Sequence, residues 1–302
     1  MTVGCQLARM LPALARGSFA RAYTEVRPPA PLASVVSALW SHERVGNGPA
    51  ARPRRILPDG STDVVLGFTP VGPAAVGGVP APLALAEAWV VGTMTTAHVV
   101  GTAAPTAYVG VRLRPEVAGR VFGVAAADLA DGRVPLDALW PNAEEFLAPL
   151  ARVPDLDGAR SGVAAALAVR LAPLAPPPAA VTRAVRLFEA SGGRARVAAV
   201  GRALGVSRQH LARQFVRHVG LAPKPFARVA RLRALHVGLR ALERRDAEVC
   251  WGALAYAHGY ADQAHLIEEV RALVGLTPSA WARERRTAEV VPFAQDGAAA
   301  DA

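Results

Sequence analysis

Cysteine and histidine are scarce: this chain of 302 residues contains 2 Cys and 7 His. Cys5 and Cys250 lie far apart and belong to no Cys-x-x-Cys pair, so the sequence predicts neither a disulfide framework nor a zinc knuckle. A metal centre needs about three or four clustered His and carboxylate ligands. Residues 1–112 offer only His42 and His98. We therefore expect no metal, no cofactor and no metal enzyme.

Long apolar runs are also absent. No run reaches the ~18 residues that a membrane-spanning helix needs. Residues 1–21 are interrupted by Arg9, Pro12 and Arg16, which makes them a poor signal peptide. We therefore expect a cytoplasmic protein with no membrane partner. The hydrophobic fraction of 52% excludes global disorder, and the length is sufficient for two domains with cores of their own.

Acidic residues are few in one part of the chain only. Residues 179–286 contain 19 Lys plus Arg and 8 Asp plus Glu, a net charge of +11. Residues 1–178 contain 15 Arg and 13 acids, and residues 287–302 contain 3 acids and no base. A basic excess confined to one segment is typical of a domain that binds a polyanion.

Four short apolar runs in residues 1–112 have the length and composition of strands. They span residues 35–40, 63–68, 88–91 and 108–113, with turn signals rich in Gly and Pro between them. The sequence predicts an α+β protein whose first module, residues 1–112, is a cupin-like β-barrel or sandwich with flanking helices. A barrel of this kind can hold one small ligand.

Trp40, Asp59, Asp63 and His98 are the candidates for binding a small-molecule effector in this module. The stretch LPDG at residues 57–60 has two interpretations. Its aspartate, with Asp63, can line the mouth of a pocket. Alternatively, the stretch forms a hairpin turn, with φ preset by the proline and a left-handed glycine. We favour the turn, and a tryptophan such as Trp40 is more often a core residue than a ligand platform.

Residues 113–172 are rich in Ala, Leu and Val and predict helices, among them one over residues 136–150 and one over residues 161–171. These helices either pack on the β-rich module or form the interface of a homodimer. Pro173 and the three prolines at 176–178 predict a stiff connector over residues 173–178. Beyond it we expect a second domain at residues 179–286 and a flexible acidic tail at residues 287–302.

The second domain contains a duplicated unit. One copy is GYADQAHL at 259–266 with VGLTP at 274–278, and the other is GVSRQHL at 205–211 with VGLAP at 219–223. The copies are offset by 54 positions at their first glycines and, after one inserted residue, by 55 positions at their leucines.

This pattern predicts two helix-turn-helix units, at about residues 197–217 and 251–271. In each, a glycine takes the left-handed turn conformation (Gly205, Gly259) and a polar residue caps the following helix (Ser207, Asp262). Between them, residues 226–242 predict an amphipathic linker helix. Recognition helices about 34 Å apart would enter two adjacent major-groove segments of double-stranded DNA.

Residues 183–286 resemble the DNA-binding domain of the AraC/XylS family of bacterial transcription regulators, most closely in the second unit. Residues 1–150 resemble, more diffusely, the sensor-like N-terminal domain of a subset of that family. That likeness is carried by LPDG followed by Asp63 and by GVRLRP at 110–115. The resemblance implies a nucleoid-associated, sequence-specific transcription regulator that responds to a small-molecule effector. It also implies contact with RNA polymerase if the protein is an activator.

By resemblance, ten positions face DNA: Ser207, Arg208, Gln209, Ala212 and Arg213 in the first unit, and Asp262, Gln263, Ala264, Ile267 and Glu268 in the second. Arg and Gln carry the donors that read guanine and adenine edges, whereas the acidic pair Glu268-Glu269 opposes phosphate. We expect the first unit to read the sequence and the second to bind weakly. We expect Tyr260 in the core and His265 in a packing or capping role.

Two alternatives stay open. One is a DNA-repair alkyl acceptor, or another enzyme with a DNA-targeting helix-turn-helix. Neither cysteine lies in the basic or metal-bound setting that such an acceptor needs. The other is a ligand-independent DNA-binding protein without sequence preference, against which two readable helices argue.

Overall fold

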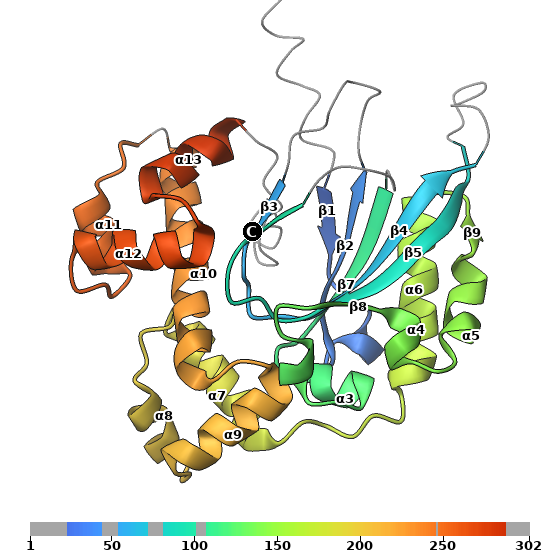
Figure 1. The fold of residues 1–302 in the computed structure, drawn as a ribbon, viewed down its shortest axis with the longest axis horizontal. Coiled ribbons are helices and arrows are strands. Elements are labelled where there is room, and N and C mark those ends of the chain that lie inside the picture. Colours follow the sequence, from blue (N-terminus) through green and yellow to red (C-terminus); the bar gives the residue numbers. More distant parts are fainter. Residues whose placement is uncertain (1–22, 44–53, 72–80, 101–106, 246, 288–302) are drawn as a thin grey trace, which may run out of the picture.

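The computed structural model describes residues 23–43, 54–71, 81–100, 107–245 and 247–287 (Figure 1). In this part of the chain a β-rich N-terminal unit is followed by helices only. The predicted fold class, an α+β protein ending in an all-α double helix-turn-helix, is confirmed. The predicted acidic tail lies outside the described residues.

The N-terminal unit is built on one antiparallel sheet of seven strands, in the order β1-β2-β7-β4-β5-β8 with β9 also paired to β5. The strands are β1 (Tyr23–Val26), β2 (Val36–Glu43), β4 (Asp63–Pro70), β5 (Leu83–Val91), β7 (Ala107–Leu113), β8 (Arg133–Pro135) and β9 (Arg152–Val153). A separate two-stranded ribbon joins β3 (Arg54–Ile56) and β6 (His98–Val100). Among the described strands the sheet stays open, with β1 and β8 at its edges, where the sequence suggested a closed barrel or a sandwich.

Alternation along the strands gives the sheet two unlike faces. Leu39, Val64, Leu66 and Val111 point to one face, are at most 3% exposed and form the core with α6 (Leu156–Leu171). The opposite face carries Trp40, Asp63 and Arg112, which are polar or amphipathic. This second face is the one available for a site.

Shorter helices complete the core under the first face. They are η1 (Ala30–Leu32), α3 (Ala118–Phe122), η2 (Ala126–Leu129), α4 (Leu136–Leu139), α5 (Ala143–Leu147) and η3 (Ala148–Leu150). The helix expected over 136–150 is broken at Pro141, because proline lacks the backbone N–H that a continuous helix needs. α6 begins at Leu156, earlier than expected, because Asp155 caps it by accepting from Gly158 N–H at 2.7 Å.

The C-terminal helices are α7 (Ala179–Ala190), α8 (Val197–Ala203), α9 (Arg208–Val219), α10 (Pro223–Arg244), α11 (Trp251–Ala257), α12 (Gln263–Val274) and α13 (Pro278–Thr287). They enclose two small cores. In the first, Phe188, Phe215 and Phe226 pack edge to face with centroids 5.7 to 6.3 Å apart. In the second, Leu266 and Trp281 are at most 1% exposed.

α10 contributes to both cores. Its N-terminal residues Phe226 and Val229 belong to the first core, and Leu232, Leu235 and Leu239 belong to the second. One continuous helix of 22 residues, about 33 Å long at ~1.5 Å per residue, therefore fixes the two units relative to each other. Figure 1 shows α9 and α12 near opposite ends of α10.

Candidate nucleic-acid interface

The two helix-turn-helix turns have the predicted geometry. Gly205 and Gly259 adopt φ values of +67° and +73°, the left-handed conformation that costs a glycine nothing. A Cβ on Gly201 would lie 3.0 Å from the carbonyl oxygen of Val206, so a small residue is needed where α8 approaches the turn. These features hold each recognition helix, α9 or α12, against the helix before it.

Both recognition helices begin at the predicted cap. The Ser207 hydroxyl accepts from His210 N–H at 3.1 Å, and Asp262 Oδ1 accepts from His265 N–H at 2.8 Å. The two side chains thereby satisfy backbone donors that the first turn of a helix leaves unpaired. Both residues are exposed, so capping is compatible with a place at the DNA surface.

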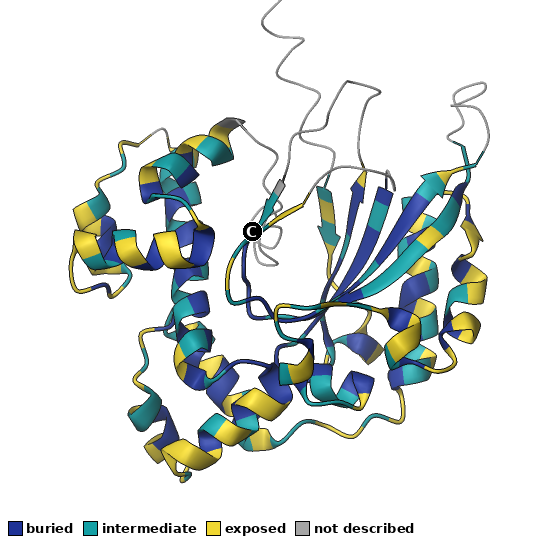
Figure 2. Ribbon diagram, in the orientation of Figure 1, coloured by how far each residue is buried: buried dark blue, intermediate teal, exposed yellow. Residues whose placement is uncertain are grey.

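The outward face of α9 is accessible. Arg208, Gln209 and Arg213 are exposed and Ala212 is half-buried, while Leu211 and Phe215 on the opposite face are at most 1% exposed (Figure 2). Among the described residues, no acidic side chain pairs with Arg208 or Arg213. The exposed side of α9 therefore combines unneutralised guanidinium groups with an amide that can read a base edge.

The outward face of α12 is accessible too, but its charge differs from the expectation at one position. Gln263, Ala264 and Glu268 are exposed and Ile267 is half-buried. Glu269 is 9% exposed; it accepts from Arg228 Nε at 2.7 Å and lies 3.7 Å from Arg231 Nη1, both on α10. Treating Glu268 and Glu269 alike was wrong, because helical geometry turns adjacent residues about 100° apart. Only Glu268 faces outward.

Tyr260 and His265 have the packing roles expected of them. Tyr260 is 4% exposed, and burial raises the pKa of its hydroxyl above the ordinary value. His265 Nδ1 accepts from Ala261 N–H at 3.2 Å, and its ring meets the Tyr260 ring edge to face. Neither side chain is presented as a base-contacting group.

Three of the four effector candidates converge on the polar face of the sheet. Trp40 Nε1 donates to Asp63 Oδ2 at 3.1 Å, and Arg112 donates to both oxygens of Asp63 at 3.2 Å. Arg112 Nε also lies 2.9 Å from Asp59 Oδ2, and Arg112 Nη1 lies 3.5 Å from Glu25 Oε2. We call these five residues the Arg112 cluster. His98 lies elsewhere, on β6 opposite Ile56 of the separate ribbon.

The cluster is buried and carries excess negative charge. Arg112 is 5% exposed and faces three carboxylates, those of Glu25, Asp59 and Asp63. Burial, opposed by Arg112 and reinforced by Asp59, raises the pKa of Asp63 to about 6. Arg112 is the residue that the sequence interpretation missed as a site component. The sequence feature that could have identified it is a charged residue in an otherwise largely apolar strand, at a position whose side chain points away from the apolar core.

Asp59 belongs both to a turn and to the cluster, so the two interpretations of LPDG hold together. Ser61 N–H donates to Asp59 Oδ1 at 2.9 Å and Gly60 has φ of +82°, as the turn requires. The same aspartate offers its other carboxylate oxygen to Arg112. Its backbone carbonyl accepts from Arg233 Nη1 on α10 at 3.2 Å.

The segment around Asp59 joins the N-terminal unit to the second helix-turn-helix. Leu57 is 5% exposed inside the core of that unit. Arg55 forms a bidentate ion pair with Glu284 of α13, with distances of 2.9 and 3.2 Å. A Cβ on Gly60 would lie 2.8 Å from the Phe226 ring, so this close approach needs a glycine. Residues 55–60 thus connect the Arg112 cluster to α10 and α13.

The N-terminal unit also contacts the C-terminal ends of both recognition helices, α9 and α12. Thr93 Oγ1 donates to the carbonyl of Val219, the last residue of α9, at 2.9 Å. Arg55 Nη1 donates to the carbonyl of Val274, the last residue of α12, also at 2.9 Å. Ala97 N–H donates to Leu273 carbonyl at 2.7 Å. Carbonyls at a helix C-terminus have no partner within the helix, and here the other domain supplies one. No sequence signal marked Thr93, Arg55 or Ala97.

Within the described ranges, no three or more His, Cys, Asp or Glu side chains are grouped so as to hold a metal ion. Among the same residues, no helix is both long enough and apolar enough to cross a membrane.

Comparison with protein families matches two separate segments of the chain. Residues 200–284 match a helix-turn-helix domain family of the AraC type, which confirms the resemblance found in the sequence. Residues 24–135 match a domain of unknown function, DUF6597. No curated protein sequence matches the chain at a significant level.

Among solved structures, the chain is similar to ToxT from Vibrio cholerae. An apo variant from strain SCE256 is 8% identical with a TM-score of 0.40, covering 81% of this chain and 97% of that one. ToxT from strain O395 is 7% identical with a TM-score of 0.40, covering 87% and 97%. The unsaturated fatty acid bound wild type is 9% identical with a TM-score of 0.38, covering 82% and 94%. Scores this low do not by themselves establish a common function.

Proposed function

We propose that this chain is a sequence-specific transcription regulator that reads DNA mainly with α9 and responds to a small-molecule effector through its N-terminal unit. DNA binding by the AraC-type helix-turn-helix domain is the part that the family match supports. The observation that carries sequence specificity is the outward face of α9, where Arg208, Gln209 and Arg213 are exposed together.

Chemistry assigns roles to these side chains. A glutamine amide can bind adenine with two hydrogen bonds, and an arginine guanidinium can bind guanine in the same way or hold a phosphate. Ala212 can offer only a methyl contact. α12 presents Gln263 but also Asp262 and Glu268, whose charges oppose phosphate. We therefore assign sequence reading to α9 and a weaker, supporting contact to α12.

The effector response rests on the Arg112 cluster. Trp40 and Asp63 lie beside each other on the polar face of the sheet, and Asp59 connects that face to Arg233 of α10. A ligand that competes for Asp59 or Arg112 would change the hydrogen bonds that end on the DNA-binding domain. His98 has no part in this proposal, because it lies on the separate ribbon.

The remaining partners follow from this role. A regulator of this kind acts on DNA in the cytoplasm, associates with the nucleoid and, if it activates, contacts RNA polymerase. A homodimer is the oligomer that a two-fold symmetric operator would require. The helices of residues 113–172 bury their apolar faces in the chain's own core, so they offer little apolar surface for dimerisation.

The test is selection from random duplex DNA with the full chain, followed by sequencing of the bound fraction. Specific binding predicts an enriched motif with one strongly selected block, contacted by α9, and a weaker block about 10 base pairs away. A bound fraction with no enriched motif would show a non-specific DNA-binding protein. A metabolite library screened for a rise in melting temperature tests the effector, with Trp40→Ala as the variant that should lose the response.

A further inference from the structure

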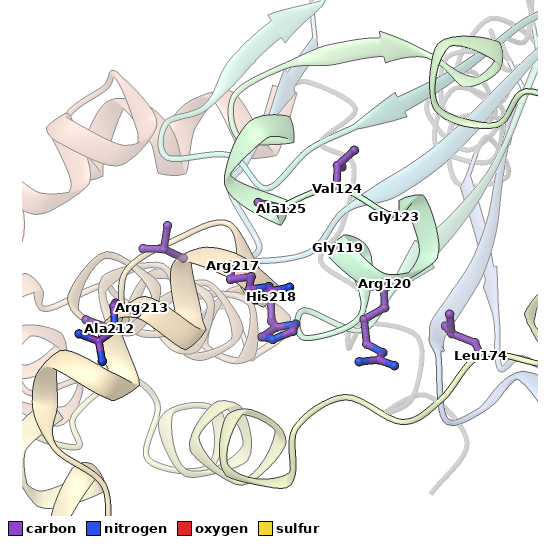
Figure 3. A pocket seen from close by; sticks show the side chains of 11 residues that line it. Gly119, Arg120, Gly123, Val124, Ala125, Leu174, Ala212, Arg213, Arg217 and His218 are labelled. Carbon is purple, nitrogen blue, oxygen red and sulfur yellow. The ribbon is translucent and has the colours of Figure 1, made fainter.

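A groove of about 890 Å³ runs between the N-terminal unit and the first recognition helix. One wall is one side of α9, with Ala212, Arg213, Val216 and Arg217. The other wall is α3 and the segment after it, including Arg120. Figure 3 shows Arg120 on one side of this groove and Arg213 on the other, with His218 between them. The N-terminal unit therefore lies beside α9 on the side that carries Ala212 and Arg213, two of the positions proposed to face DNA.

The charged side chains that line the groove are all basic, set among glycine and apolar residues. Arg120, Arg213 and Arg217 line it, no acidic residue lines it, and no acid among the described residues pairs with these three. Burial, and then the charges of Arg217 and Arg120, lower the pKa of His218. The positive potentials of the two guanidinium groups therefore overlap at this histidine. A groove with this charge is complementary to an anion.

The neighbouring helix identifies which anion fits. A recognition helix lies in a major groove about 12 Å wide, so a phosphodiester strand must run along each of its flanks. Ala212 and Arg213 are among the positions proposed to face the bases, and they line this groove. A strand passing α9 on this side would therefore run along the groove, beside the contact between α3 and the C-terminal end of α9.

We propose that Arg120 of the N-terminal unit is a phosphate contact, so that this unit forms part of the DNA-binding surface. This inference rests on the proposed DNA-binding function of α9. Arg120 is positioned for the role because its Nε donates to the carbonyl of Ala175 at 3.0 Å, which fixes the guanidinium at the groove while leaving the two Nη groups to bind.

The test compares Arg120→Gln and Arg120→Lys in the full chain, measuring affinity for the selected DNA at several salt concentrations. Each phosphate contact contributes about 0.9 to the slope of log K against log salt. Arg120→Gln should make the slope shallower by about that amount. Its affinity deficit should consequently shrink about 3.5-fold between 50 and 200 mM salt. Arg120→Lys should keep the wild-type slope, because it keeps the charge.

Three further measurements separate charge from structure. Arg152→Ala removes an exposed arginine of β9, which is not part of the groove, and should leave the slope unchanged. Melting temperatures of all variants identify any loss of folding. The ranking of DNA sequences should be the same for Arg120→Gln and the wild type, because a phosphate contact reads no base.

The possible results distinguish a failure of the Arg120 proposal from a failure of the proposed DNA-binding function of α9. If the Gln and Lys variants have equal slopes, Arg120 acts only through the Ala175 carbonyl and the inference is wrong. If Arg213→Ala weakens binding while both Arg120 variants match the wild type, the proposed function stands and the inference fails. If the wild type selects no sequence and its affinity does not vary with salt, both fail.

Discussion

Arg55 and Glu284, 229 positions apart, form a two-point ion pair that ties the β3–β6 ribbon to the last helix of the DNA-binding domain. The same guanidinium donates to the carbonyl of Val274 at the end of α12. Thr93 makes the corresponding contact with Val219 at the end of α9. Because Val219 and Val274 occupy equivalent positions of the duplicated unit, the N-terminal unit holds both recognition helices by the same backbone feature. The N-terminal unit therefore contacts the C-terminal end of each recognition helix directly.

Replacing Arg55 should loosen the second helix-turn-helix without affecting the first. Arg55→Ala removes the ion pair to Glu284 and leaves the Val274 carbonyl without its donor, which we expect to cost about 1–3 kcal/mol of local stability. Hydrogen exchange measured by mass spectrometry should show faster exchange in α12 and α13 and unchanged exchange in α9. Equal protection in the variant and the wild type would mean that the contacts of Leu57 and Ala97 hold the interface without Arg55.

Arg213 is the residue of α9 on which specific binding should depend most. Arg213→Ala should weaken binding to the selected site by about 1–3 kcal/mol, because an exposed guanidinium facing the major groove is lost. A gel-shift series against selected and scrambled duplexes measures this effect. Arg152→Ala, on the remote strand β9, serves as the control with the same change in charge. An unchanged affinity of Arg213→Ala would refute its assignment.

The adjacent residues Glu268 and Glu269 should respond differently to substitution. Glu268→Arg replaces an exposed acid on the outward face of α12, so general DNA affinity should rise and its salt dependence should steepen. Glu269→Gln removes a buried charge that Arg228 and Arg231 neutralise, so the free energy of unfolding should fall by about 1–3 kcal/mol. Urea unfolding and salt-dependent binding separate the two effects. Similar behaviour of both variants would contradict the inward orientation of Glu269.

Asp63 should give the stability of the N-terminal unit a distinctive pH dependence. Burial raises its pKa to about 6 from an ordinary value of 3.8, so the folded chain holds this proton more tightly than the unfolded chain. Its contribution to the free energy of unfolding is therefore largest below about pH 4 and falls as the pH rises to about 6. Asp63→Asn removes this titration.

The measurement for Asp63 is the difference in unfolding free energy between Asp63→Asn and the wild type across pH 4 to 7. The variant should gain stability relative to the wild type as the pH rises through this window. Trp40 fluorescence should report the same transition, because its indole N–H donates to Asp63. A difference that does not vary with pH would show that Arg112 keeps Asp63 ionised throughout.

Local patterns determined the features that depend on neighbours in sequence. The left-handed glycines, the caps Ser207 and Asp262, and the core position of Tyr260 follow from turn and helix chemistry that acts over three or four residues. Four of the nine described strands, β2, β4, β5 and β7, were found for the same reason, since alternation and turn residues are local. The longer extents of β2, β5 and α6 were missed, because their ends depend on ladder partners and caps contributed by other segments.

The polar face of the sheet was only partly predicted. Trp40, Asp59 and Asp63 were identified as candidates, but Arg112, which joins them, was not. Strand alternation places Arg112 and Asp63 on the same face only once β4 and β7 are paired in register. His98 was also a candidate, and the ribbon register placed it elsewhere.

The sequence by itself determined that this protein has a β-rich unit followed by two helix-turn-helix units of the AraC type. Each of those features depends on residues that are close together along the chain. Only the tertiary structure decided how the two parts work on each other. The contacts of Arg55, Thr93 and Ala97 with the ends of α9 and α12 involve backbone carbonyls, which leave no trace in a sequence pattern. The direction of Glu269, and the position of Arg120 beside α9, likewise depend on packing between segments far apart in the chain.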